Sequence, residues 1–416
     1  MSQSFEALGL CSQLITTLNQ LQFNTPTEVQ QQAIPYVLAG DDVLAGAQTG
    51  TGKTAAFGLP MIDAFLACDD PLTDKQIRGL VLVPTRELAQ QVFDNLCLYS
   101  QHTDLKTVVV FGGVSMKTQT AQLKGGADIL VATPGRLLDH LFNKHLSLAQ
   151  TQTFVLDEAD RMLDMGFMPD IQRILKRLPN ERQTLFFSAT FDQRIKALAY
   201  RMLKSPREIQ VTPQNSTAET VKQMVYPVDK HRKSELLAYL IGSRNWQQVL
   251  VFTKTKQGSD ALAKELKLDG IKAASINGDK TQGARQKALE DFKSGAVRAL
   301  IATDVAARGI DISQLEQVVN YDLPFKAEDY IHRIGRTGRA GHSGNAISLM
   351  SREEEGLLQA IERLLDTRLP QEWLTGFEPG AVPNVELENH RRRSRSSEKR
   401  KMKARLGVHK NRGKKR

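Results

Sequence analysis

Cysteine is scarce in this chain of 416 residues. Cys11, Cys68 and Cys97 lie far apart in the sequence and have no CxxC spacing, so neither a disulfide framework nor a zinc site is supported. Long apolar runs are also missing, because no stretch approaches the ~18 residues that a membrane span needs. The N-terminal segment has neither the basic region nor the small-residue cleavage site of a secretory signal. We therefore expect a cytoplasmic protein with no membrane partner.

An excess of basic charge is confined to the C-terminal end. Residues 390–416 contain 14 Lys/Arg and one acid, whereas residues 1–389 contain 42 Lys/Arg against 45 Asp/Glu. The basic tail has few apolar residues to offset its ordering entropy, so we predict that it is disordered. Its charge favours a polyanionic partner, because neutralising phosphates releases counterions. Nucleic acid, an acidic protein surface and membrane headgroups all fit, and a solubilising tail is the alternative.

Short runs rich in Val, Ile, Leu and Phe recur along the chain, separated by stretches with helical periodicity. Continuous apolar strands of this kind are typical of a parallel sheet that is covered on both faces. A polar stretch at 211–220 divides the runs into two series and indicates a linker. We therefore predict an α/β protein with two parallel-sheet domains of comparable size. The first series lies at 41–46, 79–84, 107–113, 128–133, 153–160 and 184–190, and the second at 224–228, 248–253, 272–278, 299–303, 317–322 and 345–350.

These patterns also set the predicted domain boundaries. Residues 1–212 form the first domain and residues 221–370 the second, which includes a helical pattern after Met350. Residues 371–416 form an extension that loses periodicity and then becomes the basic tail. Ligands bind beyond the carboxyl ends of the strands in open parallel sheets, so the polar residues that follow the strands are the candidates for chemistry.

A candidate phosphate-binding loop follows the first predicted strand. The segment AQTGTGKT at 47–54 matches GxxxxGK[ST] except that Ala47 takes the first glycine position, and an apolar, helix-compatible stretch follows. Backbone N–H groups at a helix N-terminus, with glycines that allow close approach, are suited to bind phosphates. Lys53 is expected to reach the β- and γ-phosphates and Thr54 to ligate Mg²⁺. The strand before and the helix after disfavour the alternative of a plain glycine-rich turn.

An acidic cluster at 157–160 follows the apolar segment TFVL. Mg²⁺ usually takes one carboxylate together with waters and phosphates, and Asp157 is the candidate. Glu158 is expected to orient and deprotonate the attacking water. Taken alone, such a cluster is more often a solvated loop or a helix N-cap. Together with the loop at 47–54, it predicts phosphate chemistry.

The second predicted domain lacks a phosphate-binding loop but carries HRIGRTGR at 332–339. An arginine that stabilises the charge of a transferring phosphoryl group is worth ~10³–10⁵ in rate. Three arginines at this spacing could equally pair with acids or bind RNA phosphates, so this segment by itself leaves both interpretations open.

The motifs of residues 1–370, taken together, resemble those of the DEAD-box ATP-dependent RNA helicases. Their joint order and spacing carry the resemblance, because no single short match is decisive. The compact length, short linker and basic tail resemble the bacterial RhlE-like members. The matching segments are Phe5 with FNTPTEVQ (23–30), AQTGTGKT (47–54), PTREL (84–88), GG (112–113), TPGR (133–136), DEAD (157–160), SAT (188–190), VLVFTKT (249–255), QGAR (282–285), TDVAARGID (303–311) and HRIGRTGR (332–339).

The resemblance implies two tandem RecA-like domains with ATP and Mg²⁺ as cofactors. Gln30 would hydrogen-bond the adenine edge and Phe5 would stack on its ring. Thr54 and Asp157 would hold the metal. The further nucleotide contacts implied are Gln48, Thr49, Gly50, Thr51, Gly52, Lys53, Gly309 and Asp311. The implied catalytic set is Lys53, Asp157, Glu158, the arginine fingers Arg336 and Arg339, and the residues His332, Ser188 and Thr190 that would connect hydrolysis to domain closure.

RNA would lie across both domains. The implied contacts are Pro84, Thr85, Arg86, Gly113, Thr133, Gly135 and Arg136 in the first domain and Thr253, Arg285, Thr303 and Arg308 in the second. Two residues depart from the family pattern: Gln22 stands where glycine is usual, and Glu28 replaces the second proline of PTPIQ. Both flank the adenine-reading residues without replacing them.

The implied activity is RNA-stimulated ATP hydrolysis coupled to domain closure and to local unwinding of RNA duplexes or remodelling of ribonucleoproteins. One alternative is an ATP-gated RNA clamp or annealing chaperone with little unwinding, and another is a DNA-directed motor of the same superfamily. Backbone contacts carry no sequence information, so we expect sequence-nonspecific binding of structured RNA. Ribosomal precursors and an RNA-decay complex are candidate partners.

Overall fold

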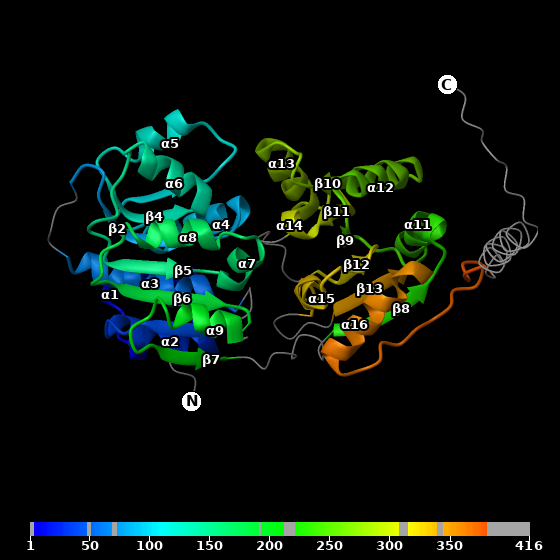
Figure 1. Ribbon diagram of the computed structural model, residues 1–416, viewed down its shortest axis with the longest axis horizontal. Helices are drawn as coiled ribbons and strands as arrows, with labels where there is room; N and C mark the ends of the chain where they lie inside the picture. The colour runs from blue at the N-terminus through cyan, green and yellow to red at the C-terminus, as the bar shows by residue number, and fades with distance from the viewer. Residues whose placement is uncertain are drawn as a thin grey trace, which may run out of the picture.

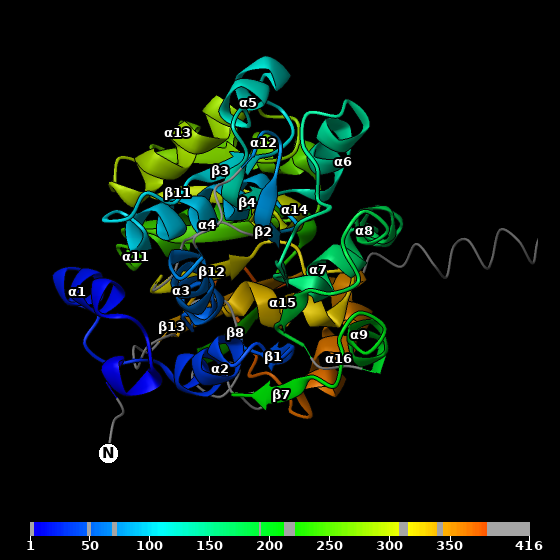
Figure 2. The same cartoon turned by 90° about the vertical axis from the view of Figure 1, so that its left-hand side faces the viewer.

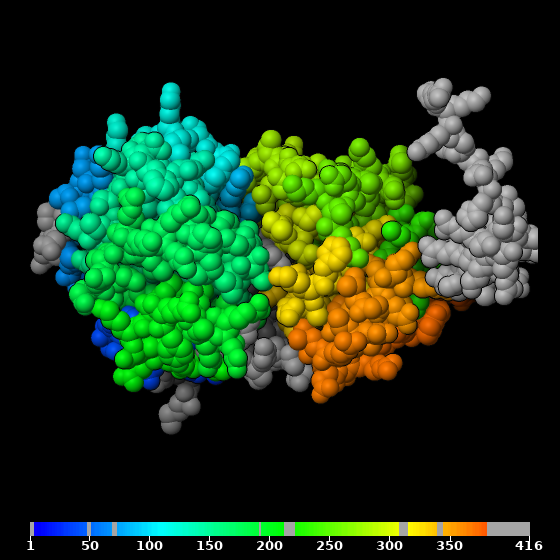
Figure 3. All heavy atoms as spheres, viewed as in Figure 1, coloured from blue at the N-terminus to red at the C-terminus, as the bar shows by residue number. Residues whose placement is uncertain are grey.

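The computed structural model describes residues 4–47, 51–68, 73–190, 193–211, 221–307, 315–338 and 344–380. Two lobes lie side by side, with the first domain on the left of Figure 1 and the second on the right. The space-filling view shows the two lobes meeting along a seam (Figure 3). Within the described ranges, no helix is long and apolar enough to cross a membrane.

The first domain is built on a seven-stranded sheet with the order β3-β4-β2-β5-β6-β1-β7, in which every pairing is parallel. Its central strands are buried along their whole length, as continuous apolar runs require. The strands are β1 (Val43–Gly46), β2 (Ile77–Leu82), β3 (Thr107–Val110), β4 (Ala127–Ala132), β5 (Thr153–Leu156), β6 (Gln183–Ser188) and β7 (Arg207–Gln210).

Helices cover this sheet and form an apolar core on each of its two faces. Figure 2 turns the first domain toward the viewer, with α2 and α3 in front of the sheet. The helical segments are η1 (Glu6–Leu8), α1 (Ser12–Gln20), α2 (Glu28–Leu38), α3 (Lys53–Leu66), α4 (Arg86–Tyr99), α5 (Met116–Gln122), α6 (Pro134–Phe142), α7 (Ala159–Asp164), α8 (Met168–Leu175) and α9 (Gln193–Ala199).

The second domain repeats the plan with a six-stranded parallel sheet of order β10-β11-β9-β12-β13-β8. Its strands are β8 (Val221–Pro227), β9 (Val249–Thr253), β10 (Ala273–Ile276), β11 (Ala299–Thr303), β12 (Gln317–Asn320) and β13 (Gly344–Met350). Its helical segments are η2 (Lys230–Arg232), α11 (Lys233–Ser243), α12 (Lys256–Leu268), α13 (Gln282–Lys293), α14 (Asp304–Ala307), α15 (Ala327–Ile334), η3 (Arg352–Glu354) and α16 (Glu355–Leu365).

The predicted fold class is confirmed, since every apolar run in both series contains a strand. The sequence pattern missed β7, an edge strand in which only Ile209 is buried and the charged Arg207 and Glu208 are exposed. Apart from Val211, the predicted linker at 211–220 lies outside the described residues, as does the basic tail.

The first part of the C-terminal extension lies against the second domain. Gln371 forms a parallel bridge with Val225 of the edge strand β8. Phe377 packs on Tyr239 with ring centroids 5.4 Å apart, and the Arg232 guanidinium lies 4.7 Å from the Phe377 ring centroid. These contacts shield the backbone of an edge strand, as edge strands require.

Polar contacts join the two domains at two places. The Glu87 carboxylate of α4 accepts hydrogen bonds from Gln282 and lies 2.8 Å from Nη2 of Arg285 on α13. At the second place, Lys326 Nζ lies 3.1 Å from Asp164 at the end of α7. In Figure 1, α4 and α7 are the elements of the first domain that face the second.

Candidate nucleotide site and RNA-facing surface

A cavity of about 620 Å³ opens beside the phosphate-binding loop in the first domain. It combines aromatic and amide groups from the N-terminal segment with the charged groups that follow β1 and β5, as expected for ligand sites at strand ends. The lining residues are Phe5, Gln22, Phe23, Asn24, Thr25, Thr27, Gln30, Gly52, Lys53, Thr54, Ala55, Leu88, Gln91, Asn95, Tyr99, Asp157 and Glu158.

Gln30 connects the start of α2 to the phosphate-binding loop. Its Oε1 accepts from the Thr27 N–H at 2.9 Å in a capping box, which fixes the amide's orientation. Its Nε2 donates to the Gly52 carbonyl at 3.0 Å. Gly52 has φ +89, and a Cβ there would lie 2.4 Å from Gln30 Nε2, so both conformation and space require glycine.

The apolar end of this cavity comes from the N-terminal segment. Phe5 is 5% exposed and precedes η1. Phe23 meets Tyr99 edge to face with ring centroids 6.2 Å apart, and burial raises the pKa of Tyr99 to about 12. Gln22 has φ +60, a left-handed conformation that explains why glycine would suit this position. Gln22 therefore adopts the left-handed conformation although it is not the glycine that is usual in the family.

Lys53 and Asp157 meet in the buried interior of the phosphate end. Lys53 Nζ lies 3.6 Å from Asp157 Oδ1, and this buried ammonium has no hydrogen-bond partner in the described part of the chain. Burial raises the pKa of Asp157, an effect that the Lys53 charge opposes. A buried ammonium that has no hydrogen-bond acceptor among the described residues, beside the carboxylates of the acidic cluster, fits a ligand that brings phosphate oxygens.

Glu158 occupies a strained backbone position at the start of α7. Its φ of +54 and ψ of +49 are left-handed, which is uncommon outside glycine and costs of order 1–3 kcal/mol. Its side chain is 1% exposed and lies 3.4 Å from Nη1 of Arg161. Such strain persists only where the surroundings impose it, and it concentrates at functional sites.

Asp160 links the acidic cluster to the end of β6. Thr190 Oγ1 faces Asp160 Oδ2 at 3.5 Å, the upper limit for a hydrogen bond, and the Thr190 N–H donates to Ser188 Oγ at 3.3 Å. The Ser188 carbonyl in turn accepts from the Ala47 N–H at 3.0 Å. The structure thus brings the SAT segment, the DEAD segment and the phosphate-binding loop together.

The second domain presents α15 to α7. Arg161 of the first domain shares a narrow interdomain crevice with His332, Arg333 and Arg336. Arg336 is 4% exposed. Because Arg161 also pairs with Glu158, the candidate arginine finger lies one side chain away from the candidate water-orienting carboxylate.

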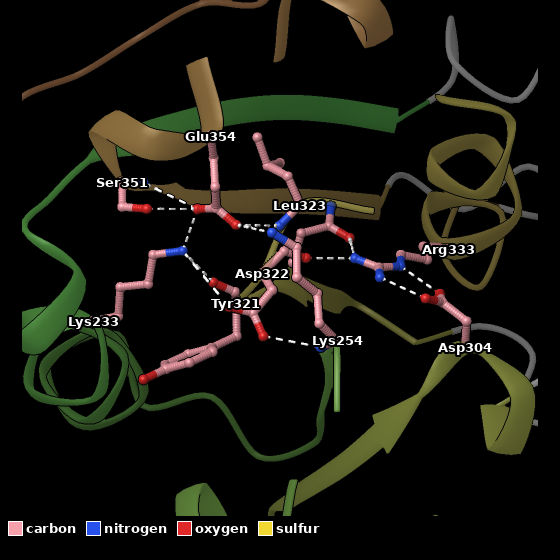
Figure 4. A network of polar contacts seen from close by, with 10 residues as sticks. Lys233, Lys254, Asp304, Tyr321, Asp322, Leu323, Arg333, Ser351 and Glu354 are labelled. Atoms are coloured by element: carbon pink, nitrogen blue, oxygen red, sulfur yellow. Dashed lines mark hydrogen bonds and ion pairs between the residues drawn. The ribbon is translucent and has the colours of Figure 1, made fainter. Parts of the chain in front are cut away.

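Arg333 is held inside the second domain. Its Nε and Nη2 donate to the two carboxylate oxygens of Asp304 at 2.6 and 2.7 Å, and its Nη1 donates to Asn320 Oδ1 and to the Asp322 carbonyl. This bidentate pair is visible at the right of Figure 4. It fixes α15 to the ends of β11 and β12, and so sets the position of Arg336 one turn further on.

A second part of the same network is centred on the buried Glu354 (Figure 4). Its carboxylate accepts from Lys233 at 2.5 Å, from Lys254 at 2.9 Å and from the backbone N–H of Leu323 at 3.1 Å. Burial alone would raise the pKa of Glu354, but the two lysines and the Ser351 N–H lower it to about 2.

The predicted RNA contacts of the first domain lie on neighbouring loops. The Arg86 guanidinium fills the space over Gly113, where a Cβ would meet Nη1 at 2.1 Å, and Gly113 has φ +85. Arg136 Nη1 donates to the Val114 carbonyl at 3.0 Å. Pro84 and Thr85 end the turn into α4, and Thr133 and Gly135 start α6. Figure 1 places α4, α5 and α6 along the upper part of the first lobe.

Two of the matching positions in the second domain lie at the ends of strands. Thr253 and Thr303 are buried at the ends of the adjacent strands β9 and β11. Arg285 is paired with Glu87, and burial lowers its pKa, an effect that this carboxylate opposes. Seven predicted positions lie outside the described residues, namely Gln48, Thr49, Gly50, Arg308, Gly309, Asp311 and Arg339.

Four residues of this arrangement were missed by reasoning from the sequence. Arg161 received no role, and for Arg333 the sequence left open whether it pairs with acids or binds RNA phosphates; both residues are under 4% exposed. Glu87 and Asp304 stand inside quoted motifs without an assigned role. Part of this signal was available in the sequence, because buried charges need partners and Arg333, Glu87 and Asp304 each stand next to an assigned residue.

The fold defines a protein with two RecA-like domains, the first of which has a cavity lined by residues of the predicted phosphate-binding loop and of the acidic cluster at 157–160. Two family models match the chain: "DEAD/DEAH box helicase" over residues 27–198 and "Helicase conserved C-terminal domain" over residues 232–341. The DEAD-box ATP-dependent RNA helicase RhpA of Helicobacter pylori is 42% identical over 366 residues, which span 88% of this chain and 73% of that protein. CshA of Bacillus subtilis, described in the same words, is 42% identical over 363 residues, or 87% and 72% of the two chains.

Solved structures show the same likeness. The structure of S. cerevisiae Dbp5 bound to RNA and ADP BeF3 has a TM-score of 0.79 at 31% identity, covering 89% of this chain and 96% of that one. A DEAD box protein from Methanococcus jannaschii has a TM-score of 0.51 at 37% identity, covering 90% and 100%. The chain belongs to the DEAD/DEAH box helicase family and is an ATP-dependent RNA helicase.

Proposed function

We propose that this helicase closes its two domains around ATP and RNA, and that each ligand stabilises the closed arrangement for the other. The observation that carries this proposal is the position of Arg336, which shares an interdomain crevice with Arg161, the partner of Glu158. The charged groups for hydrolysis are thus divided between two domains that meet at this seam. Two ligands that each favour one closed state must be reciprocally coupled.

The nucleotide base is proposed to bind at the aromatic end of the first-domain cavity. Gln30 presents an amide held at both ends by backbone groups, and Phe5 offers a ring for stacking. A site that hydrogen-bonds a base rejects analogues lacking the matching groups by large factors. Adenine is therefore the expected base. Its binding would compete for the Gln30–Gly52 hydrogen bond and so would signal to the phosphate-binding loop.

The triphosphate and a divalent cation are proposed to bind at the charged end. Lys53 Nζ lacks a hydrogen-bond acceptor, which phosphate oxygens would supply, and Thr54 and Asp157 would hold Mg²⁺. In the described ranges no group of three or more His, Cys, Asp or Glu residues could hold a metal by itself. Mg²⁺ with one or two protein oxygens, waters and phosphates needs no such cage. When bound, it would neutralise developing charge on the phosphates.

For hydrolysis, Glu158 is proposed to orient the attacking water and accept its proton. The strained backbone and the Arg161 ion pair hold its carboxylate in one place. Arg336, together with Arg339, would stabilise the charge on the transferred group from the second domain. Ser188, Thr190 and His332 would link this site to closure, and the contact between Thr190 and Asp160 supports the first part of that route.

RNA is proposed to bind across the upper side of both lobes in Figure 1 through its backbone. Gly113, Arg86 and Arg136 lie close together in the first domain. The pair Glu87–Arg285 fastens this surface to α13 of the second. A strand held by both lobes in one bent path would exclude its complement, which gives local unwinding. Contacts to the 2′-OH would provide the preference for RNA.

The basic tail is proposed to tether structured RNA by phosphate neutralisation, with ribosomal precursors and an RNA-decay complex as the partners to examine first. Relatedness to the RhlE-like members remains a prediction from the length and tail. A cytoplasmic location is proposed on the basis of the three cysteines, which are all free thiols and suit a reducing compartment.

The first test compares the ATPase rate without nucleic acid, with single-stranded RNA and with matched DNA at fixed low salt. Full-length protein and a chain ending at Asn389 are measured side by side. Strong stimulation by RNA alone, retained by the shorter chain, is expected because the coupling residues lie in the two domains. Equal stimulation by RNA and DNA would contradict the RNA assignment.

A duplex assay distinguishes the helicase from its alternative, an ATP-gated clamp or annealing chaperone. We expect ATP-dependent separation of a short RNA duplex with a single-stranded extension, and a smaller effect on a blunt duplex of the same sequence. RNA-stimulated hydrolysis without strand separation on either substrate would favour the clamp.

A further inference from the structure

A buried glutamine joins two loops of the proposed RNA surface. Gln119 on α5 is 4% exposed and uses both ends of its amide. Its Nε2 donates to the Phe111 carbonyl at 3.0 Å, next to the Gly112–Gly113 turn. Its Oε1 accepts from Arg136 Nη1 at 2.8 Å and faces His140 Nε2 at 3.2 Å. A guanidinium only donates, so the arginine itself fixes which end of the amide is oxygen.

The proton positions in this cluster follow from its chemistry. The Gln119 oxygen only accepts, so His140 Nε2 carries a proton, and a neutral His140 ring then has Nδ1 as an acceptor. His145 Nδ1 lies 3.1 Å from it and must donate. His140 is fully buried; burial lowers its pKa to about 4, His145 and Arg136 act in the same direction, and Asp139 opposes them. The neutral ring is therefore the form present at neutral pH.

This chain of hydrogen bonds occupies one side of the Arg136 guanidinium. The two protons of Nη1 go to Gln119 and to the Val114 carbonyl, and Nε lies 3.6 Å from Asp139. The side chain is 11% exposed, so its stem has little freedom. Among the described residues no hydrogen-bond acceptor is found for Nη2, so its N–H groups can take a phosphate oxygen. Arg136 is thus held by both α5 and the turn that contains Gly113.

We propose that Gln119 and His140 are positioning residues for RNA: they hold Arg136 and the turn at 111–114 in the RNA-binding arrangement before RNA arrives. This inference rests on the proposed function, in which Arg136 and Gly113 contact the RNA backbone. A preorganised guanidinium loses less freedom on binding, so the cluster contributes affinity without touching the ligand. Helices α5 and α6, which carry it, lie together at the top of the first lobe in Figure 1.

The test uses Gln119→Met, which keeps the length of the side chain and removes its hydrogen bonds. We expect the RNA concentration at half-maximal ATPase stimulation to rise about tenfold, since a hydrogen bond to a charged group is lost. The maximal rate at saturating RNA should stay within about twofold of wild type. Gln90→Met is the matched control, because Gln90 pairs with Asp94 on the exposed face of α4, and it should match wild type.

A second variant, His140→Phe, preserves the ring and removes its donor. It leaves the bond between Arg136 and Gln119 in place, so a smaller rise of about threefold is expected. Thermal melting is followed for each variant, because a role limited to stability would lower the melting temperature without separating the two kinetic constants. Equal half-maximal RNA concentrations for wild type, Gln119→Met and His140→Phe would overturn the inference.

Arg136→Ala distinguishes failure of this inference from failure of the proposed function. If the half-maximal RNA concentration is unchanged in Arg136→Ala, the proposed contact between Arg136 and RNA is wrong. If the half-maximal RNA concentration rises in Arg136→Ala but not in Gln119→Met, Arg136 contacts RNA and the cluster does not position it. We expect the half-maximal RNA concentration to rise in both Arg136→Ala and Gln119→Met, and to rise more in Arg136→Ala.

Discussion

The two domains share one architecture and differ in what their strand ends carry. In the first domain, the loops after β1 and β5 bring a buried Lys53 without hydrogen-bond acceptors and a left-handed Glu158 to the wall of a cavity. In the second, Asp304 after β11 pairs with the buried Arg333 of α15, and the buried Glu354 pairs with Lys233 and Lys254. The first domain therefore has charged groups that can bind a ligand, whereas the charged groups of the second domain pair with one another and stabilise its loops.

This difference gives a division of labour. We propose that the first domain binds a nucleotide by itself, because aromatic, amide and charged groups line its cavity. The second domain presents Arg336 from the turn that follows α15, a helix that the Arg333–Asp304 pair holds in place. Its contribution to catalysis therefore depends on closure against the first.

The largest expected effect comes from removing the group that the second domain supplies. Arg336→Ala should lower the ATPase rate at saturating ATP and RNA by ~10³, because arginine fingers stabilise the transferring phosphoryl group. ATP affinity without RNA should change little, since the nucleotide cavity belongs to the first domain. Steady-state ATPase and nucleotide titration check both, with Arg363→Ala on the exposed side of α16 as the control. If Arg336→Ala weakened only ATP binding and left the ATPase rate at saturating ATP unchanged, the proposed separate roles of the two domains would be contradicted.

A stability test should single out the second domain. Asp304→Asn leaves the Arg333 guanidinium buried without its carboxylate partner, which costs about 3 kcal/mol when a buried pair is broken. The melting transition of the second domain should fall while that of the first is unchanged. An unchanged melting profile would show that the pair does not hold α15 in place.

The two domains should also respond to acid in different pH ranges. His140 in the first domain has its pKa lowered to about 4 by burial, so the folded state resists protonation and loses stability as pH falls from about 6.5 toward 4. Glu354 in the second has its pKa lowered to about 2, against burial, by Lys233 and Lys254. Its contribution is complete above about 4.5 and is lost as pH falls toward 2.

Melting curves across this pH range test the comparison. His140→Phe should flatten the loss between pH ~6.5 and 4, and Glu354→Gln should flatten the loss at lower pH. If Glu354→Gln instead flattened the loss of stability between pH ~6.5 and 4, the assignment of that loss to His140 would be wrong.

The smallest effect concerns the turn before the cavity. Gln22 has φ +60, so Gln22→Gly should relieve backbone strain in the folded state. Glycine also gives the unfolded chain more freedom, which offsets part of this gain, so the net rise in the free energy of unfolding should be roughly 0.5 kcal/mol. Thermal melting measures it, with Asp366→Gly as a comparison at another left-handed position. A clear destabilisation would mean that the Gln22 side chain makes a needed contact.

The sequence alone predicted every strand except β7, and it predicted the phosphate-binding loop, because continuous apolar runs and a glycine-rich turn are local patterns. It did not reveal the pairing of Glu87 with Arg285, which joins residues far apart in the chain. The strained Glu158 was also invisible, since the αL conformation of a glutamate is imposed by tertiary packing rather than by its own preference. Gln119 gave no signal for the same reason: a polar residue on a short helix becomes informative only once its burial is known.

The central claim, reciprocal coupling through a divided site, is tested most directly with Glu158→Gln, which should bind ATP and remain closed. RNA affinity is measured with and without saturating ATP, and ATP affinity with and without saturating RNA. The account predicts that ATP tightens RNA binding and that RNA tightens ATP binding by the same factor. RNA affinity that is independent of ATP, or ordinary ATPase turnover in this variant, would contradict it.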